Sequence, residues 1–578
     1  MDFKEIIADL VHKESGVDKN IIVKIIEIPP DPKLGDYSLP CFIFAKQLKK
    51  SPQNIALELK DKLNMINLKQ DHRHFELINN VGAYINFFVN KQLLIKNILT
   101  KIMHEKECYG SKEPQKSVVL IESPGPNTNK PLHLGHLRNM LLGQCLYDIL
   151  KFQGKDAHIV NVVNDRGVHI CKSMLAYQKY GQGKTPESTN TKPDHFVGDY
   201  YVMYQNLEKE NPGIEKDIQE MLVKWEDDDL ETRKLWRKMN LWCLEGFEQT
   251  YQKLDFKIER EYFESETYMH GKEIIIDGWK NKLFDMDENK AIIINLEDQG
   301  LGKKVLLRSD STSVYITQDI FMAKKRFDDY RFDEMYYIVG NEQEHHFKVL
   351  FEVFKRLGWK FSEKCYHFSY GMVELPEGKM KSREGTVIDT DDLIDSVIKI
   401  AKDEVAKRYD ALSDEEIDKR SRIIAMSAIR FFFLKFDPLR NFVFNPKESL
   451  AFDGETGPYI EYSYARINSI FRKLGEDIEG YIKDADISLL NEKNEFELAK
   501  ILANYPKIID QAARELKPSL IAHYVLGLAQ SFNEFYHANP ILISEEKLRK
   551  ARLYLIYCIQ LVMKSAMKLM HIEEIDEM

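Results

Sequence analysis

A strand–helix–strand pattern between residues 117 and 165 limits the possible folds more than any other feature. Residues 117–123, SVVLIES, form a continuous apolar run, typical of a strand buried on both faces of a parallel sheet. Residues 133–154 then show helical periodicity and end at Gly154, a residue type favoured just after a helix. Residues 157–165, AHIVNVVND, predict a second strand. The unit is βαβ, the building block of a doubly wound nucleotide-binding sheet.

The same alternation returns further along the chain. Residues 314–327 and 342–358 have helical periodicity, whereas residues 334–340 and 365–373 predict strands. Between them and the first unit, residues from about 181 to 300 are long-helical and heavily charged. We expect this segment to be a helical insertion that interrupts the sheet.

The two ends of the chain differ from this central part. Residues 1–112 predict a small mixed α+β domain, because helical patterns surround a turn-rich segment and a strand-like VGAYINFFV. Beyond about residue 390 only long amphipathic patterns remain. We therefore expect a multidomain α/β protein with a Rossmann-type domain at 113–440 and an all-α bundle at 441–578.

Length and cysteine usage narrow the class of protein. A chain of 578 residues is too long for a single hydrophobic core. The seven cysteines form no C-x-x-C pair, and Cys365 and His367 are assigned to packing, so we expect neither disulfides nor bound zinc. No apolar run is long enough to cross a bilayer and the N-terminus lacks a secretory pattern, so we expect a cytoplasmic protein without a membrane partner.

The formal net charge is −10, which taken alone argues against a nucleic-acid partner. Any RNA contact has to come from local basic clusters, such as the one formed by Arg466, Arg472 and Lys473. By composition alone, each such cluster is a solvated helix face.

Two histidines open the helix of the first βαβ unit. A helix N-terminus at the carboxyl end of a strand attracts anions through its unpaired N–H groups and its dipole. Gly135 lets a nucleotide approach the backbone closely, and His133 and His136 share one helix face from which both can donate hydrogen bonds to phosphate. Phosphoryl-type transfer needs such donors, because the enzyme mainly positions groups and neutralises charge.

Residues 126–139, PNTNKPLHLGHLRN, resemble the HIGH motif of the class I aminoacyl-tRNA synthetases, and their arrangement is similar to that of the arginyl members in particular. The resemblance implies ATP binding by His133, Gly135 and His136, catalysis by both histidines, and a contact of His136 with arginine. It also implies the reaction, ATP-dependent ligation of L-arginine to tRNA(Arg) through an arginyl-adenylate, with release of pyrophosphate and AMP. ATP is expected as its Mg²⁺ complex, with the ion held mainly by phosphates. In this family, tRNA usually has to bind before arginine is activated.

A cationic loop at 378–387, GKMKSREGTV, is a second candidate for phosphate contact. Lys379, Lys381 and Arg383 can neutralise phosphate charge, and glycines near both ends suit a hinge. Taken alone, the segment is equally well explained as an exposed basic loop.

The same loop differs from the family's KMSK pattern. Lys379 and Met380 match it and imply ATP binding, but Lys381 and Ser382 occupy the third and fourth positions. Many arginyl members share the missing fourth lysine, and in them the lysine before the HIGH motif takes over its role. Here that residue is Lys130, so Lys130, Lys379 and Lys381 all remain candidates for the catalytic cation.

Recognition of arginine requires planar, charged acceptors for the guanidinium. Tyr315 and Asp319 are four residues apart and therefore share one helix face. By themselves they are an ordinary core tyrosine and surface aspartate. The Y-x-x-x-D spacing, however, matches a segment that lines the amino-acid pocket of the arginyl family.

The resemblance adds further pocket residues. It implies that Asn127 and Gln343 orient the α-amino and carboxylate groups of arginine. Glu122, at the end of the first predicted strand, is a second candidate acceptor. We therefore expect Asp319, together with Glu122 or Tyr315, to hold the guanidinium, and His346 to be structural.

The RNA partner is implied by residues 456–473, TGPYIEYSYARINSIFRK, which resemble the first helix of the family's anticodon-binding domain. Tyr462, Tyr464, Ala465 and Arg466 occupy the positions that face tRNA there. An aromatic ring beside an arginine can stack on a base and contact a phosphate. Packing of the helix explains part of the same pattern. The N-terminal domain is similar to the appended domain that meets the tRNA elbow.

Two other functions are compatible with parts of the sequence. A nucleotidyltransferase with the same H-x-G-H chemistry does not need the C-terminal helical third. A non-catalytic binding module derived from a synthetase agrees with the altered KMSK loop, but not with the intact histidine pair, Lys130, Tyr315 and Asp319. Arginine-dependent pyrophosphate exchange, with and without tRNA, separates all three. We expect the protein to act as a monomer.

Overall fold

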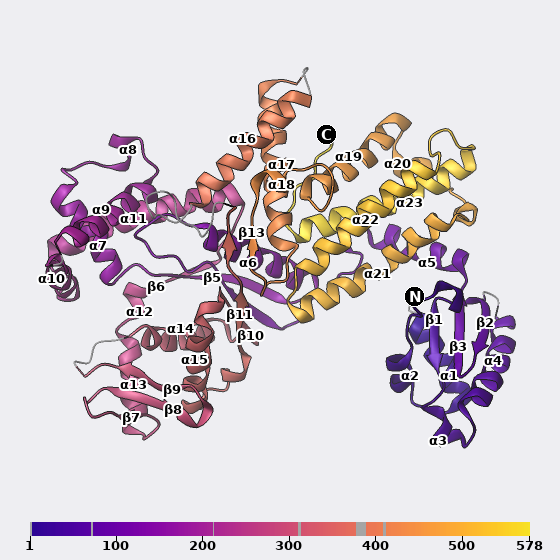
Figure 1. Ribbon diagram of the computed structural model, residues 1–578, viewed down its shortest axis with the longest axis horizontal. Helices are drawn as coiled ribbons and strands as arrows, with labels where there is room; N and C mark the ends of the chain where they lie inside the picture. Colours follow the sequence, from indigo (N-terminus) through magenta and orange to yellow (C-terminus); the bar gives the residue numbers. More distant parts are fainter. Residues whose placement is uncertain are drawn as a thin grey trace.

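Three parts follow one another along the chain in Figure 1: an N-terminal α+β domain, a central domain around a parallel sheet, and a C-terminal helical bundle. This arrangement confirms the multidomain α/β class predicted from the sequence. The computed structural model describes residues 3–70, 73–211, 213–309, 314–376, 389–408 and 412–577.

The central sheet has five strands, and every neighbouring pair is parallel. In order across the sheet, the strands are β11 (Cys365–Tyr370), β10 (Glu334–Gly340), β4 (Val118–Glu122), β5 (Asp156–Val163) and β6 (Arg260–Phe263). The middle residues of β4 are fully buried, as the apolar run predicts for a strand covered on both faces.

The connections across the sheet define where a ligand can bind. Helix α6 (Leu134–Phe152) leads from β4 to its neighbour β5. Helix α15 (Glu344–Arg356) leads from β10 to its neighbour β11, in the opposite direction across the sheet. The strand order therefore reverses between β4 and β10. In an open α/β sheet, ligands bind outside the carboxyl ends of the strands at this switch point.

The long segment between β5 and β10 begins with helices. They are α7 (Val168–Tyr180), α8 (Pro186–Thr189), α9 (Pro193–Glu210), α10 (Ile214–Glu226) and α11 (Leu230–Leu254). This part agrees with the helical insertion expected from the sequence.

The expected extent of the insertion, about 181–300, is too broad. Strand β6 lies inside it and pairs with β5 through residues 160–163, so the segment returns to the central sheet after α11. The sequence obscures β6 because an edge strand of four residues lacks a long apolar run.

A smaller unit follows β6. It consists of α12 (Glu264–Thr267), α13 (His270–Lys280), the antiparallel strands β7 (Asp285–Met286), β8 (Ile292–Leu296) and β9 (Gly302–Leu307), and α14 (Tyr315–Tyr330). Helix α14 contacts α13, α15 and β9, so it joins this unit to the central domain.

The N-terminal domain is built on a three-stranded antiparallel sheet of order β1-β3-β2. Its elements are α1 (Phe3–Ser15), α2 (Lys19–Ile25), β1 (Tyr37–Pro40), α3 (Phe44–Leu48), α4 (Pro52–Leu68), β2 (Phe75–Val81), β3 (Tyr84–Val89) and α5 (Lys91–Glu105). Helix α5 packs on the C-terminal helices and links the two ends of the chain.

Helices dominate after residue 389. They are α16 (Thr390–Arg408), α17 (Asp414–Leu434), α18 (Pro446–Ser449), α19 (Gly457–Leu474), α20 (Ile478–Ile482), α21 (Lys493–Glu515), α22 (Ser519–Ala538) and α23 (Glu546–Leu569). Strands do not disappear entirely, because β13 (Phe442–Val443) pairs in parallel with β12 (Val373–Glu374). No helix of the described residues has the length and apolar character needed to cross a membrane.

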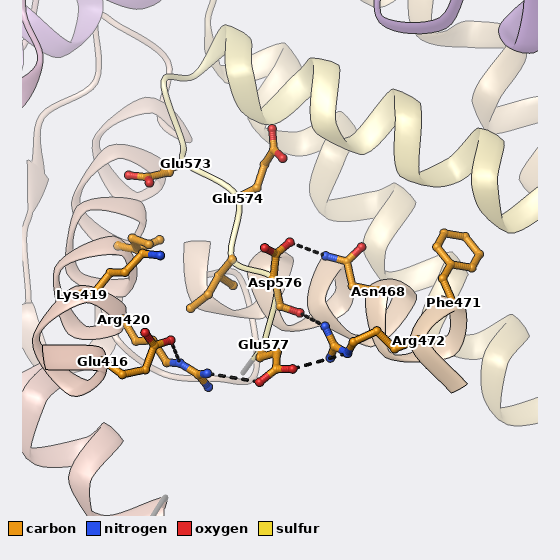
Figure 2. Close-up of a pocket in the computed structure, with 12 residues that line it drawn as sticks. Glu416, Lys419, Arg420, Asn468, Phe471, Arg472, Glu573, Glu574, Asp576 and Glu577 are labelled. Carbon is orange, nitrogen blue, oxygen red and sulfur yellow. Dashed lines mark hydrogen bonds and ion pairs between the residues drawn. The ribbon is translucent and has the colours of Figure 1, made fainter. Parts of the chain in front are cut away.

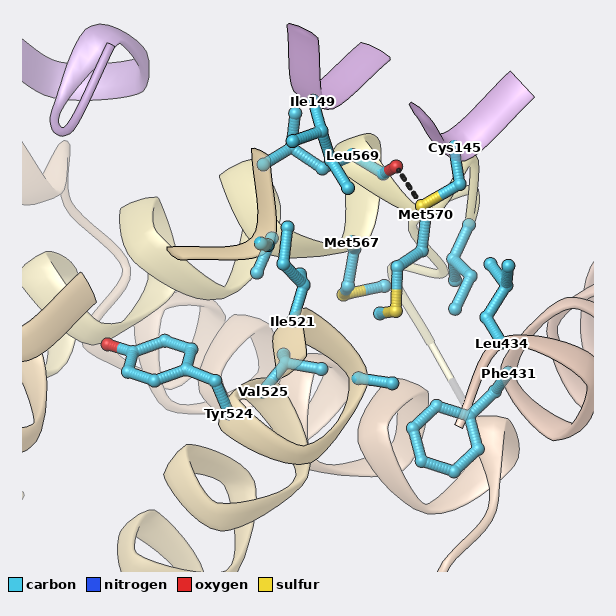
Figure 3. Packing of buried hydrophobic residues seen from close by; sticks show 14 of the residues in the cluster. Cys145, Ile149, Phe431, Leu434, Ile521, Tyr524, Val525, Met567, Leu569 and Met570 are labelled. Atoms are coloured by element: carbon cyan, nitrogen blue, oxygen red, sulfur yellow. Dashed lines mark hydrogen bonds between the residues drawn. The ribbon is translucent and has the colours of Figure 1, made fainter. Parts of the chain in front are cut away.

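The helix that opens at His133 is anchored from behind by the bundle. Figure 3 shows side chains of α6, α17, α22 and α23 meeting in one buried cluster. Cys145 of α6 donates a hydrogen bond of 3.1 Å from Sγ to the carbonyl of Leu569. Phe431 and Met567 are completely buried in the same cluster. This packing holds α6 in place, with its first turn at the carboxyl end of the sheet.

Candidate active site

The predicted histidine pair forms the N-terminal cap of α6. His133 is the N-cap residue, and its Nδ1 accepts a hydrogen bond of 3.1 Å from the N–H of Gly135. In return, Nδ1 of His136 accepts a hydrogen bond of 3.1 Å from the N–H of His133. The two rings stack with their centroids 3.8 Å apart. A Cβ on Gly135 would lie 3.0 Å from the His133 ring, so a larger residue here would require the ring to shift.

These bonds fix the tautomer of both rings. A backbone N–H can donate only to an unprotonated ring nitrogen, so Nε2 carries the proton in each neutral imidazole. Burial, reinforced by the charge of Lys130, lowers the pKa of His133 to about 4. Burial and the neighbouring His133 place the pKa of His136 well below its usual value. Both residues therefore present Nε2–H donors at neutral pH.

Lys130 lies close to the histidine pair. Burial lowers the pKa of its ammonium group, and its charge in turn lowers the pKa of both histidines. Within the ranges that the structure describes, no carboxylate lies within ion-pair distance of Lys130 Nζ. An unpaired, half-buried ammonium beside a helix N-terminus is suited to a phosphate.

The residues predicted to bind the amino acid include two side chains of α14, Tyr315 and Asp319. Asp319 lies on α14, and one of its carboxylate oxygens is 2.7 Å from Nε2 of His346 on α15. His346, which was expected to be structural, therefore directly contacts Asp319, the predicted acceptor for arginine. Tyr315, one turn before Asp319, has 71% of its surface exposed and stands at the rim.

Glu122 is already paired with another residue of the protein. Its carboxylate forms an ion pair with Arg326 of α14, and Arg326 is almost completely buried. Burial raises the pKa of Glu122, although the positive charge of Arg326 opposes the shift. The ion pair ties β4 to α14 through one carboxylate oxygen of Glu122, and Asp319 lies close enough to act on its pKa. A role of Glu122 as an acceptor for a ligand guanidinium stays a prediction.

Glu264 is a buried carboxylate close to Asp319 and Tyr315 that no motif in the sequence singles out. It follows β6 directly and is 7% exposed. Burial raises the pKa of Glu264 to about 7, Arg166 opposes the shift, and the nearby charges of Asp165 and Asp319 add to it. The charge of Glu264 also acts on Tyr315. Its position after a strand of the central sheet is the signal that could have identified it, but β6 was assigned to the insertion.

Asn127 and Gln343 lie on either side of the switch point. Asn127 bridges in parallel to Asn164, the residue that follows β5, and so lies between the ends of β4 and β5. Gln343 ends a short 3-10 helix directly after β10 and is exposed. The structure places both residues at the carboxyl edge of the sheet, where the sequence predicted them.

Lys379, Met380 and Lys381, like the whole segment 378–387, lie outside the described residues. The chain is described again from Asp389, which pairs with His133 in an antiparallel bridge. The N–H of Thr390 donates to the carbonyl of Leu132 over 2.9 Å. The residues that follow the predicted cationic loop are therefore attached directly to the HIGH motif.

The predicted RNA-contacting residues on α19 divide into two groups. The guanidinium of Arg466 lies over the rings of Tyr462 and Tyr536, 4.7 and 5.0 Å from their centroids. Tyr462 is exposed, whereas Tyr464 and Ala465 are 4% and 5% exposed and belong to the core. The prediction of RNA contact is therefore corrected for Tyr464 and Ala465, because a helix turns them toward its packing partners.

The C-terminal tail occupies the opposite side of α19. Figure 2 shows the tail running between α17 and α19 beside a cavity of about 740 Å³. Glu577 pairs with Arg420 at 3.3 Å and with Arg472 at 3.5 Å. Asn468 donates to the carboxylate of Asp576 over 3.2 Å. Arg472 thus pairs with the tail. Of the predicted basic cluster, Arg466 and Lys473 remain as candidates for contact with RNA.

Comparisons with known proteins agree along the whole chain. The family described as "tRNA synthetases class I (R), catalytic domain" matches residues 98–446. The "DALR anticodon binding domain" matches residues 460–578, and the "Arginyl tRNA synthetase N terminal domain" matches residues 1–89.

Individual relatives cover nearly the full length. The chain is 44% identical to the arginine–tRNA ligase of Treponema denticola, over 100% of this chain and 99% of the relative. It is 42% identical to that of Treponema pallidum, over 96% and 95% of the two chains. The arginyl-tRNA synthetase structure of Thermus thermophilus superposes with a TM-score of 0.80 at 26% identity, covering 100% and 99%. The chain therefore belongs to the arginyl-tRNA synthetases, within class I of the tRNA synthetases.

Proposed function

We propose that the protein ligates L-arginine to tRNA(Arg) in two steps that use ATP. In the first step, the arginine carboxylate attacks the α-phosphate of ATP, a new C–O–P linkage forms, and pyrophosphate leaves. In the second step, a hydroxyl of the terminal tRNA ribose attacks the arginyl carbonyl and AMP leaves. The observation that carries the proposal is the paired histidine cap of α6 beside a pocket lined by Asp319 and Glu264.

Charge develops on the phosphate oxygens during the first step. The Nε2–H groups of His133 and His136 and the positive end of α6 are fixed donors for these oxygens, so little reorganisation is needed when charge develops. Lys130 adds a full positive charge from the same side. The position of Lys130 beside the histidine pair supports it as a catalytic cation. Lys379 and Lys381, which lie outside the described residues, remain candidates beside it.

The pocket around α14 supports recognition of arginine. A guanidinium offers five donors in a planar fork that matches carboxylates. Glu264 provides a buried carboxylate and Asp319 a partly exposed one, and the exposed ring of Tyr315 lies one helical turn before Asp319. Asn127 and Gln343, at the strand ends, are in position to orient the α-amino and carboxylate groups.

Magnesium enters this proposal as part of the substrate. ATP binds as its Mg²⁺ complex, and an ion that keeps several waters needs few protein ligands. The protein residues contribute the donors and Lys130, while the ion neutralises the departing pyrophosphate.

The exposed face of α19 supports contact with tRNA. Arg466 lies between two aromatic rings and donates to Asn533 over 2.6 Å, so its guanidinium is held in a fixed orientation. A stacked arginine and tyrosine can receive an unpaired base. The local positive charge explains how a chain of net charge −10 can still bind RNA.

Pyrophosphate exchange tests the proposal. We expect labelled pyrophosphate to enter ATP only when arginine and tRNA are both present. Exchange with arginine but without RNA would identify an activating enzyme with no need of tRNA. No exchange under any condition would favour a binding module, and lysine or ornithine in place of arginine serves as the specificity control.

A further inference from the structure

Helix α9 and the residue before it contact two parts of the chain, the segment that leads into the histidine pair and the residues around Asp389 and Asp391. Its closest approach is at Gly198, where a Cβ would lie 2.7 Å from Cδ of Pro131 and 3.5 Å from Cα of Lys130. The Cδ of proline belongs to a rigid ring bonded to the backbone nitrogen, so it cannot move aside alone. The absence of a side chain at Gly198 therefore sets the distance between α9 and Pro131, the residue that follows Lys130.

The beginning of α9 holds a second segment through a buried ionic network. The ammonium of Lys192 lies 3.0 Å from Asp194 and 2.8 Å from Asp391. It also donates to Thr250 of α11 over 2.7 Å. The side chain of Asp194 is fully buried. Burial lowers the pKa of Lys192, but Asp194 and Asp391 outweigh this effect and raise it, so the network stays charged.

His195 extends the network toward the HIGH motif. Its Nε2 lies 3.2 Å from a carboxylate oxygen of Asp389. The other oxygen of Asp389 accepts the N–H of Asp391 over 2.7 Å and so caps α16. The backbone of Asp389 pairs with His133. One side chain thus joins α9, α16 and the histidine cap of α6.

The same group of residues has the composition of a cation site. Ligand atoms of Asp194, His195 and Asp391 lie within 4.8 Å of one another. The ammonium of Lys192, however, already contacts both carboxylates. The cluster is therefore an ion network within the protein, in which Lys192 already balances the carboxylates.

From these contacts we propose that α9 is a positioning element for adenylate formation. Gly198 sets the position of Pro131 and, through it, of the adjoining Lys130. Lys192 and His195 set the position of Asp389, and the backbone of Asp389 in turn positions His133. None of the three α9 residues needs to touch the substrate. The inference rests on the proposed function, because it assigns α9 to the same phosphate-transfer step.

Gly198→Ala tests the inference with a minimal change. The new methyl group overlaps Pro131 and has to displace it, which shifts the adjoining Lys130. Misplacement of a catalytic group by about 1 Å can cost about 100-fold in rate. We expect kcat for arginine-dependent exchange to fall about 10- to 100-fold. The KM for arginine should stay unchanged, since the pocket of Asp319 and Glu264 is not displaced.

Gly527→Ala is the matched control. Gly527 also lies within a long helix, α22, but a Cβ there would meet no atom within 4 Å. Alanine favours helix over glycine, so Gly527→Ala should keep or raise the melting temperature, whereas the overlap with Pro131 should lower that of Gly198→Ala. A Gly198→Ala protein that melts lower but keeps wild-type kcat per folded molecule would overturn the proposal, since it would assign Gly198 to packing alone.

The ionic end of α9 is tested at His195, because Lys192→Met would leave the buried carboxylate of Asp194 without its lysine partner and endanger folding. His195→Leu should lower kcat for exchange, and His195→Gln, whose amide keeps a polar group beside Asp389, should restore most of it. Equal kcat in both variants would refute the role of this contact. A wild-type protein without exchange would instead refute the proposed function, so the two failures are distinguishable.

Discussion

Binding of arginine should release a proton from Glu264. In the empty pocket, burial raises the pKa of Glu264 to about 7. A guanidinium beside the carboxylate favours the ionised form and lowers this pKa. The carboxylate therefore has to be deprotonated for tight binding, and the affinity for arginine should fall as the pH falls through 7.

The magnitude follows from the populations of the two protonation states. With a pKa of about 7, about 90% of molecules carry the proton at pH 6 and about 10% at pH 8. The affinity for arginine should therefore be roughly tenfold weaker at pH 6 than at pH 8, a difference of about 1.4 kcal/mol. At pH 7, about half a proton should be released for each arginine bound.

Isothermal titration calorimetry measures both quantities. Titration of arginine at pH 6, 7 and 8 gives the affinities, and repetition at pH 7 in buffers of different ionisation enthalpy gives the number of protons released.

Glu264→Gln isolates the source of the effect. The amide keeps the shape of the side chain but loses a hydrogen bond to a charged group, which is worth about 1.5–3 kcal/mol. We expect weaker arginine binding at pH 8 and no pH dependence between 6 and 8. If the variant kept the wild-type pH dependence, another group would be titrating and the assignment of Glu264 to the pocket would be refuted.

Four further changes test other parts of the site. Asp319→Ala should abolish arginine activation and leave ATP binding intact; a normal KM for arginine would show that the pocket lies elsewhere. Lys130→Met should lower kcat for exchange by about 100- to 1,000-fold, as expected for removal of a transition-state donor, and an unchanged kcat would transfer its role to another cation. Arg466→Met should raise the KM for tRNA and reduce the salt dependence of tRNA binding by about one ion, while exchange at saturating tRNA is unaffected; an unchanged salt slope would argue against this RNA face. Arg326→Met should destabilise the protein by about 3–5 kcal/mol in urea unfolding, because Glu122 is left buried and unpaired, and adding Glu122→Gln should recover part of the loss.

The central βαβ unit was predictable because its determinants are neighbours in the sequence. Three consecutive buried residues of β4 give an apolar run, and the histidine cap of α6 uses residues only three apart. Local patterns of this kind do not depend on the rest of the fold. The HIGH motif and the family resemblance lie in the same short stretch.

The insertion and β6 were predicted less well. The helices α7–α11 have clear periodicity, but β6 contains only four residues at the edge of the sheet. Its membership of the sheet depends on pairing with β5, about 100 residues earlier in the chain. Because β6 was missed, the site residue that follows it, Glu264, was missed as well.

By itself, the sequence determined the class of the fold, the phosphate-binding start of α6 and the residue types that arginine requires. Only the tertiary structure decided which of those residues are available. Glu122 forms an ion pair with Arg326, and Tyr464 is turned into the core of the bundle. Burial and ion pairing depend on partners brought together by long-range packing, whereas the sequence shows only the side chains themselves. For the same reason, no local pattern could show that Gly198 leaves space for Lys130 and Pro131.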